Sequence, residues 1–137
     1  MSVAVRSLPV LLMSSFVFCA GCGGAPTGPV TYKVAGMVTF NSTPVDGGEI
    51  IVRSQDGKHA AASIITNGHY ELKATTGPKV VEVTAMRDVP GKFREDNPGE
   101  KVPVREQYIP AKYNSSTTLK LEVIPKETLD ANFDLAK

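Results

Sequence analysis

Apolar residues alternate with polar ones along most of the chain after Tyr32. A period of two is typical of β-strands that bury one face. In the first such run, residues 32–40, the side chains of Val34, Val38 and Phe40 share a face. Six further runs follow, at residues 49–54, 59–66, 69–75, 79–86, 117–124 and 131–136. Short turn clusters lie between the runs, so the sequence predicts an all-β fold, a seven-stranded antiparallel β-sandwich.

The clearest turn is Asn67-Gly68, because a type I′ hairpin turn needs positive φ at both central positions. It predicts that the runs on either side, residues 59–66 and 69–75, form a hairpin. The two histidines of the chain, His59 and His69, flank this hairpin, which would allow them to approach each other, but alternation places His69 on the outward face and favours two surface histidines.

Charge is almost balanced, with 15 Lys+Arg against 14 Asp+Glu. Removing residues 1–21 removes one of these charges, Arg6, and leaves 14 against 14. A neutral domain has no electrostatic attraction to nucleic acid or to an acidic membrane surface. We therefore expect no nucleic-acid partner.

The N-terminal residues have the features of an export signal. Arg6 precedes an apolar run at residues 8–18, which is shorter than the about 20 apolar residues needed to span a bilayer. Ala20 and Gly21 then stand directly before Cys22, a pattern that resembles the bacterial lipobox. The resemblance implies cleavage before Cys22 and a lipid (palmitate-type acyl chains) on that residue. An ordinary secretory signal cut near Ala20, with Cys22 left free, is the alternative.

This interpretation divides the chain into a lipoprotein signal peptide (1–21), a flexible tether (22–31) and a β-sandwich domain (32–137). After cleavage Cys22 is the remaining cysteine, so the mature chain has no intramolecular disulfide. Two or more acyl chains anchor a protein stably. We expect the domain to be held at the inner or outer membrane, in the periplasm or at the cell surface.

Several motifs carry a further resemblance: Val34-Ala-Gly-Met-Val-Thr-Phe40, Thr43-Pro-Val-Asp-Gly-Gly48, and the Asn-Gly turn into Tyr-Glu-Leu. Together they resemble the carboxypeptidase regulatory-like domain, which implies a transthyretin (prealbumin)-like sandwich. The Ile109-Pro-Ala-Lys-Tyr-Asn114 segment, with the two strands after it, is similar to small lipoproteins of planctomycete-type bacteria.

Motifs for catalysis are absent from the sequence. It has no Gly-x-Ser-x-Gly elbow, His-Glu-x-x-His helix or Gly-rich phosphate loop. The Tyr-Arg-Gly-Ser motif of transthyretin-like hydroxyisourate hydrolases does not occur either. His59 and His69 have no third metal ligand at a recognisable spacing. We therefore predict no enzyme, no cofactor and no metal, with an unrecognised active site near the two histidines as an alternative.

Residues 87–116 show no periodicity and are predicted to form a long loop rich in both signs of charge. Because exposed loops often carry binding, the candidate binding residues are Arg87, Phe93, Arg94, Asp96, Asn97, Glu100, Tyr108 and Tyr113. Three of them, Asp96, Asn97 and Glu100, offer oxygen ligands for calcium. Tyr108, Ile109 and Tyr113 are more apolar and are expected to pack over the sandwich edge.

The leading hypothesis is a lipid-anchored cell-envelope module with a non-enzymatic binding or structural role, whose partner is an envelope protein or polysaccharide. The alternative is a carbohydrate- or peptide-binding module that acts through residues 87–116. Lys33 and Asn132 lie on the first and last predicted strands, which suits an internal isopeptide bond. Alternation places both side chains on the outward face, whereas that cross-link forms between buried groups.

Overall fold

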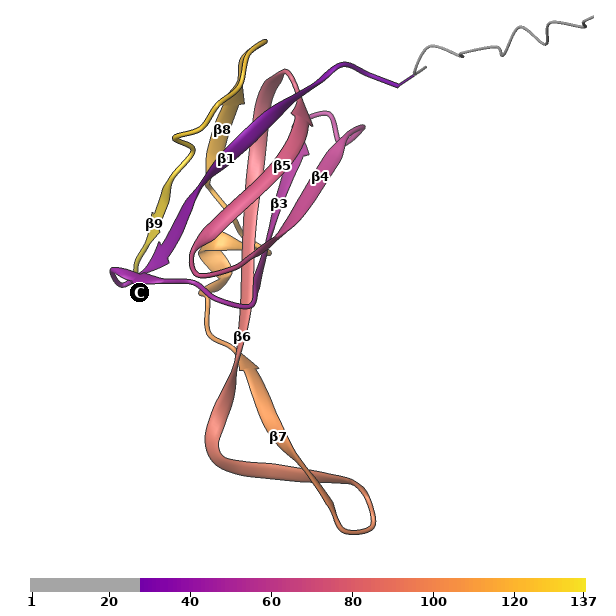
Figure 1. Ribbon diagram of the computed structural model, residues 1–137, viewed down its shortest axis with the longest axis vertical. Helices are drawn as coiled ribbons and strands as arrows, with labels where there is room; N and C mark the ends of the chain where they lie inside the picture. The colour runs from indigo at the N-terminus through magenta and orange to yellow at the C-terminus, as the bar shows by residue number, and fades with distance from the viewer. Residues whose placement is uncertain (1–27) are drawn as a thin grey trace, which may run out of the picture.

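The computed structural model describes residues 28–137, so the predicted signal peptide, Cys22 and the first part of the tether lie outside the described residues. Within residues 28–137 the regular structure is nine β-strands and one short 3₁₀ helix (Figure 1). The elements are β1 Thr31–Phe40, β2 Thr43–Pro44, β3 Gly48–Ser54, β4 Ala60–Ile65, β5 His69–Thr75, β6 Gly77–Asn97, β7 Glu100–Gln107, η1 Ala111–Tyr113, β8 Lys120–Val123 and β9 Phe133–Leu135. The predicted all-β class is confirmed.

The strands form two sheets. In the first sheet the order is β2-β1-β5, and β9 also pairs with β1. In the second sheet the order is β4-β3-β6-β7, and β8 also pairs with β6. Figure 1 shows β1 and β5 lying in front of β3 and β6, which gives the two layers of a β-sandwich.

The core lies between the two layers and is built from alternate residues of each strand. Val34 and Val38 of β1 have no exposed surface, and the same holds for Val81 and Val83 of β6. Full burial of each such side chain stabilises the fold by about 1.5–3 kcal/mol. The other core residues are Val45, Ile50, Val52, Ile65, Tyr70, Leu72, Ala74, Ala85, Ile109, Val123, Ala131 and Leu135.

All seven predicted runs contain a strand, but one pairing differs from the expected antiparallel pattern. β9 lies parallel to β1, with Val38 opposite Phe133 and Phe40 opposite Leu135. The chain reaches β9 from β8, which belongs to the other sheet. It therefore crosses between layers instead of turning back in a hairpin, and it enters the first sheet in the same direction as β1.

The prediction of a long irregular loop at residues 87–116 is wrong. β6 continues to Asn97 and pairs with β7 along much of that stretch, which adds a strand that the periodicity did not indicate. The period of two marks strands with one buried face. This part of β6 has no core to cover, and its residues 90–97 are exposed.

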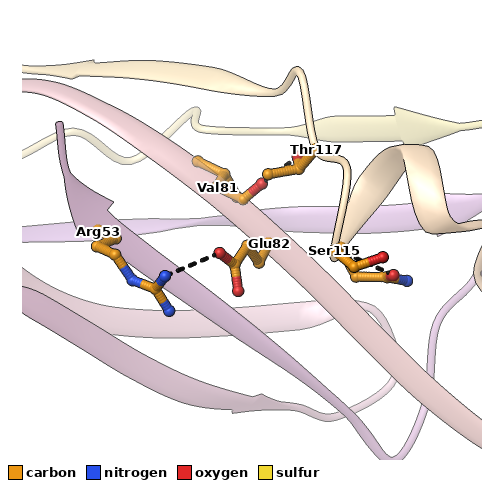
Figure 2. A network of polar contacts seen from close by, with 6 residues as sticks. Arg53, Val81, Glu82, Ser115 and Thr117 are labelled. Carbon is orange, nitrogen blue, oxygen red and sulfur yellow. Dashed lines mark hydrogen bonds and ion pairs between the residues drawn. The ribbon is translucent and has the colours of Figure 1, made fainter. Parts of the chain in front are cut away.

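The segment that follows β7 is fastened to the second sheet by side-chain hydrogen bonds. The Thr117 hydroxyl donates to the Val81 carbonyl at 2.6 Å. The Asn114 amide donates to the Val83 carbonyl of β6 at 3.5 Å. It also donates to the carbonyls of Ile109 and Pro110 within the segment itself, at 3.1 and 3.2 Å. Figure 2 shows the Thr117 contact beside an ion pair of 3.2 Å that joins Arg53 of β3 to Glu82 of β6.

Across residues 28–137, no helix has the length and hydrophobicity required to cross a lipid bilayer.

Candidate functional site: the projecting arm

The outer part of β6 and the whole of β7 form a two-stranded ribbon that leaves the body of the sandwich (Figure 1). We call residues 86–107 the arm. Its pairing begins with Met86 opposite Gln107 and ends with Asn97 opposite Glu100. The start of β1 lies at the other end of the body, since Thr31 pairs with Thr75, close to where β6 begins. The arm and the N-terminal entry of the chain are therefore at opposite ends.

The arm bends at a β-bulge. Asp88 pairs with Arg105 and Phe93 pairs with Pro103, so residues 89–92 of β6 lie opposite Val104 alone. Gly91 within this stretch has φ +71°, a value that side chains other than glycine rarely adopt. Bulges of this kind bend a ribbon and increase its twist. The outer half of the arm consequently points in a different direction from the base.

Ion pairs stabilise the arm on its surface. Arg87 contacts Glu106 at 2.7 Å across the strands, and Arg105 contacts Asp88 at 3.4 Å. Exposed pairs of this type contribute about 0–1 kcal/mol each. Five basic and five acidic residues make the arm neutral: Arg87, Lys92, Arg94, Lys101 and Arg105 against Asp88, Glu95, Asp96, Glu100 and Glu106.

Six of the eight candidate binding residues lie on the arm: Arg87, Phe93, Arg94, Asp96, Asn97 and Glu100. The Phe93 side chain is 59% exposed and lies just beyond the bulge. Arg94 contacts Asp96 at 2.9 Å, and the Asn97 amide donates to Glu100 at 2.7 Å. The polar candidates are thus engaged with one another, whereas Phe93 is an apolar surface open to a partner.

The hypothesis of a calcium site at the arm tip gains no support. The oxygens of Asp96 and Glu100 already accept contacts from donors of the arm. Glu95 is likewise bonded to the Gly99 amide at 2.6 Å. Among the described residues, no group of three or more His, Cys, Asp or Glu is placed to hold a metal ion.

The two remaining candidates, Tyr108 and Tyr113, are partly buried and pack against the core of the sandwich. The Tyr108 ring packs edge-on against Phe40, with the centroids 5.6 Å apart, and the Arg87 guanidinium lies 5.5 Å from its centre. Burial raises the pKa of the Tyr108 hydroxyl, against a smaller opposing effect of Arg87. The Tyr113 hydroxyl accepts a hydrogen bond from the Ala136 amide at 3.0 Å. With Ile109 2% exposed, the prediction that this segment packs over the sandwich edge is confirmed.

The structure does not bring the two histidines together. His59 precedes β4, and His69 begins β5, so the six residues of β4 separate them. An extended strand of that length spans about 20 Å. β4 and β5 also belong to different sheets, so the predicted hairpin is joined only near its turn, where Thr66 and His69 form a bridge.

A surface hollow of about 730 Å³ lies on the outer side of the first sheet. Residues of β1, β4, β5, β9 and the segment before β9 line it, among them Met37, His69, Glu71, Asn132 and Asp134. Many of its polar groups are already bonded. Asn132 accepts from the Met37 amide at 2.7 Å, Asp134 accepts from the Thr39 hydroxyl, and Glu71 contacts Lys33 at 2.9 Å. Lys33 and Asn132, considered for an isopeptide bond, thus have different partners.

Lys79 is a residue that sequence reasoning missed. Its side chain is buried, with 3% of the residue exposed, between the ends of the two sheets. The sequence pattern contained the signal for its burial. Lys79 is two positions before Val81, so the alternation places it on the same inward face as Val81, Val83 and Ala85. A lysine on the core face of a strand needs partners, since buried charges are costly without them.

No family model matches the chain, and no curated protein matches it. Among solved structures, it is similar to the crystal structure of a 9R-lipoxygenase from Cyanothece PCC8801, with a TM-score of 0.38 and 14% identity. The likeness covers 82% of this chain and 18% of the lipoxygenase, so the chain spans less than a fifth of that protein.

This comparison corrects one expectation. The sequence predicted that the chain is not an enzyme, yet the solved structure that it resembles is that of an enzyme. The expectation that the chain is not an enzyme is not upheld, because a likeness this weak does not establish that activity is absent. A likeness at this TM-score carries no argument, so it assigns no activity to the chain either.

Proposed function

We propose that this chain is a lipid-anchored lipoprotein of the cell envelope that uses the arm to bind an envelope protein. Cys22 carries the lipid, residues 22–31 form the tether, and the sandwich holds the arm away from the membrane. The observation that carries the proposal is the position of the arm, which projects from the end of the body opposite to the N-terminal entry (Figure 1).

The dimensions suit a module that reaches from a membrane. A ten-residue tether spans at most about 30–36 Å when extended. The β6 half of the arm, residues 86–97, adds up to about 40 Å at the rise of an antiparallel strand. A partner at some distance from the membrane surface is therefore within reach of the arm tip.

The surface of the arm favours a protein partner over a polysaccharide. Sugar-binding surfaces commonly stack several exposed aromatic rings, and Phe93 is the one aromatic residue of the arm. Its exposed ring pairs with the exposed Pro103 on the facing strand, and the two offer an apolar anchor inside a rim of balanced charges. Such an apolar centre with a polar rim is the usual composition of a protein interface.

The motif resemblance to the carboxypeptidase regulatory-like domain supports a transthyretin-like type of sandwich for residues 32–137. The seven strands expected for that type correspond to β1, β3, β4, β5, β6, β8 and β9. On this assignment β2 and β7 are additions, and the arm is an elaboration of one inter-strand connection.

Photo-crosslinking in the native envelope tests the proposal. A photoreactive residue at position 93 is expected to capture one defined protein, because Phe93 is the apolar centre of the arm. The matched control is the same residue at position 120, on the exposed Lys120 of β8 in the body. Equal capture at both positions, or capture of glycan alone at position 93, contradicts a protein-binding arm.

A further inference from the structure

Lys79 lies at the end of the sandwich nearest to the tether, where its ammonium is held by three oxygen atoms. The Ser54 hydroxyl is 2.7 Å away, the Thr75 hydroxyl 2.8 Å and the Thr76 carbonyl 3.1 Å. Ser54 is directly opposite Lys79 on β3, so the two side chains share the inner face. All three acceptors are neutral groups.

The charge of Lys79 has no opposite charge beside it. None of the five ion pairs in residues 28–137 involves Lys79. A buried ammonium without an anion is costly, even when hydrogen bonds satisfy its donors. A lysine on the surface avoids this cost. We take the burial of Lys79 inside the sandwich as an indication that an anion completes the site.

A cavity of about 110 Å³ adjoins Lys79 and is basic. Its lining includes Lys73 and His59 together with Lys79, and no Asp or Glu. A water molecule needs only about 10–15 Å³ of such space, so the cavity has room for a small polyatomic anion. In the neighbouring hollow of about 520 Å³, the one carboxylate is Asp56, which already accepts a hydrogen bond from the Lys58 amide.

The position of the cavity adds a second indication. Pro29 lines both hollows, and Val30 beside it is an exposed apolar residue, 71% accessible. Pro29 is seven positions after Cys22, a span of at most about 25 Å. On the proposed anchoring, this end of the sandwich therefore faces the layer of lipid headgroups, where phosphate groups are abundant.

We infer that the tether-side end of the sandwich binds a phosphate group at Lys79, with Lys73 and His59 as further donors. The three N–H donors of Lys79 are already used, so a bound phosphate oxygen takes the place of one neutral acceptor while its other oxygens accept from Lys73 and His59. A chloride ion or a single carboxylate does this less well. The expected orientation of the bound domain rests on the proposed anchoring at Cys22, but the presence of the site does not.

The first experiment measures phosphate binding to the full chain in a neutral detergent. Thermal unfolding is followed against increasing sodium phosphate, with sodium chloride of equal ionic strength as the reference. Phosphate also raises the melting temperature of proteins non-specifically, so the comparison is between variants. Wild type is expected to show an additional, saturable rise, and Lys79→Met is expected to weaken phosphate binding about tenfold or more.

The matched control is Lys120→Met, which removes an exposed lysine that lines neither hollow. It is expected to respond to phosphate as wild type does. An unchanged saturable response in Lys79→Met overturns the inference and leaves Lys79 with a structural role. Should that variant fail to fold, Lys73→Met tests the same cavity through an exposed side chain, and an unchanged affinity there likewise overturns it.

A second experiment separates the two sources of phosphate. The full chain is placed in vesicles that contain phosphatidic acid, and hydrogen exchange of residues 75–81 is measured before and after addition of inorganic phosphate. If a lipid headgroup fills the site, the added phosphate gives no further protection. If free phosphate is the ligand, it protects this segment as it does in detergent. If the chain binds phosphate but carries no lipid on Cys22, the proposed anchoring is wrong and the phosphate site stands.

Discussion

Gly36 of β1 and Ala131, which precedes β9, are in backbone contact. A Cβ atom at position 36 would lie 2.1 Å from the Ala131 carbonyl oxygen and 2.4 Å from its carbon. The same oxygen accepts a hydrogen bond of 2.6 Å from the buried Tyr70 hydroxyl. One backbone carbonyl therefore joins the returning end of the chain to two strands of the first sheet, and only glycine leaves room for it.

Gly36→Ala is expected to destabilise the protein by about 2–4 kcal/mol. The added methyl overpacks this contact, and moving the Ala131 carbonyl weakens its bond to Tyr70. Urea unfolding measures the loss. Gly28→Ala is the control, since a Cβ there meets no atom within 4 Å. Equal stability of the two variants contradicts the contact.

Tyr70 predicts a specific loss of stability at alkaline pH. Burial raises the pKa of its hydroxyl well above the ordinary value of about 10. The folded state favours the neutral hydroxyl of Tyr70. The stability that this preference contributes is complete below about pH 10, and it declines as the pH rises above the pKa that Tyr70 has in the unfolded chain. The decline has a limiting slope of about 1.4 kcal/mol per pH unit.

Tyr70→Phe isolates this effect. The variant is expected to be about 1 kcal/mol less stable than wild type at pH 7, because it lacks the bond to the Ala131 carbonyl. Above pH 10 its disadvantage should shrink and then reverse, as measured by denaturant unfolding across pH. A constant difference from pH 8 to pH 11.5 would falsify the assignment.

Arg87→Ala tests the coupling between the arm and the body. Arg87 contacts Glu106 across the arm and lies over the Tyr108 ring at the base. Global stability should fall by no more than about 1 kcal/mol, because these contacts are exposed. Hydrogen exchange in residues 86–107 should accelerate by more than this global change explains. Lys101→Ala, at an arm position without an ion pair among the described residues, is the control and should leave exchange near wild type.

Cys22→Ser tests the proposed anchor. The lipid cannot form on a serine hydroxyl in place of the thiol, so the variant should lose acyl labelling and accumulate as an uncleaved or soluble species. Metabolic labelling with a fatty acid and detergent phase partitioning measure both properties. Partition of a signal-cleaved Cys22→Ser chain into detergent is incompatible with the anchor.

The strands of the body were predictable from the sequence because each covers a core. Val34 and Val38 of β1, and Leu72 and Ala74 of β5, alternate with polar residues, and the structure buries them. The arm was missed for the same reason. Strands solvated on both faces have no apolar period, and their pairing depends on cross-strand contacts such as Arg87 with Glu106.

The sequence by itself determined the all-β class, the positions of seven strands and the burial of Tyr108, Ile109 and Tyr113 against the body. All of these follow from local patterns of hydrophobicity and turn residues. The tertiary structure alone decided which strands pair, including the parallel match of β1 with β9.

The same division applies to the sites. The alternation of β6 assigns Lys79 to the inner face, but only the folded chain brings Ser54, Thr75 and Thr76 around its ammonium. Residues from two sheets and the tether meet at that end of the sandwich. Contacts between segments far apart in the chain depend on how the layers stack, and no local pattern of residues encodes that stacking.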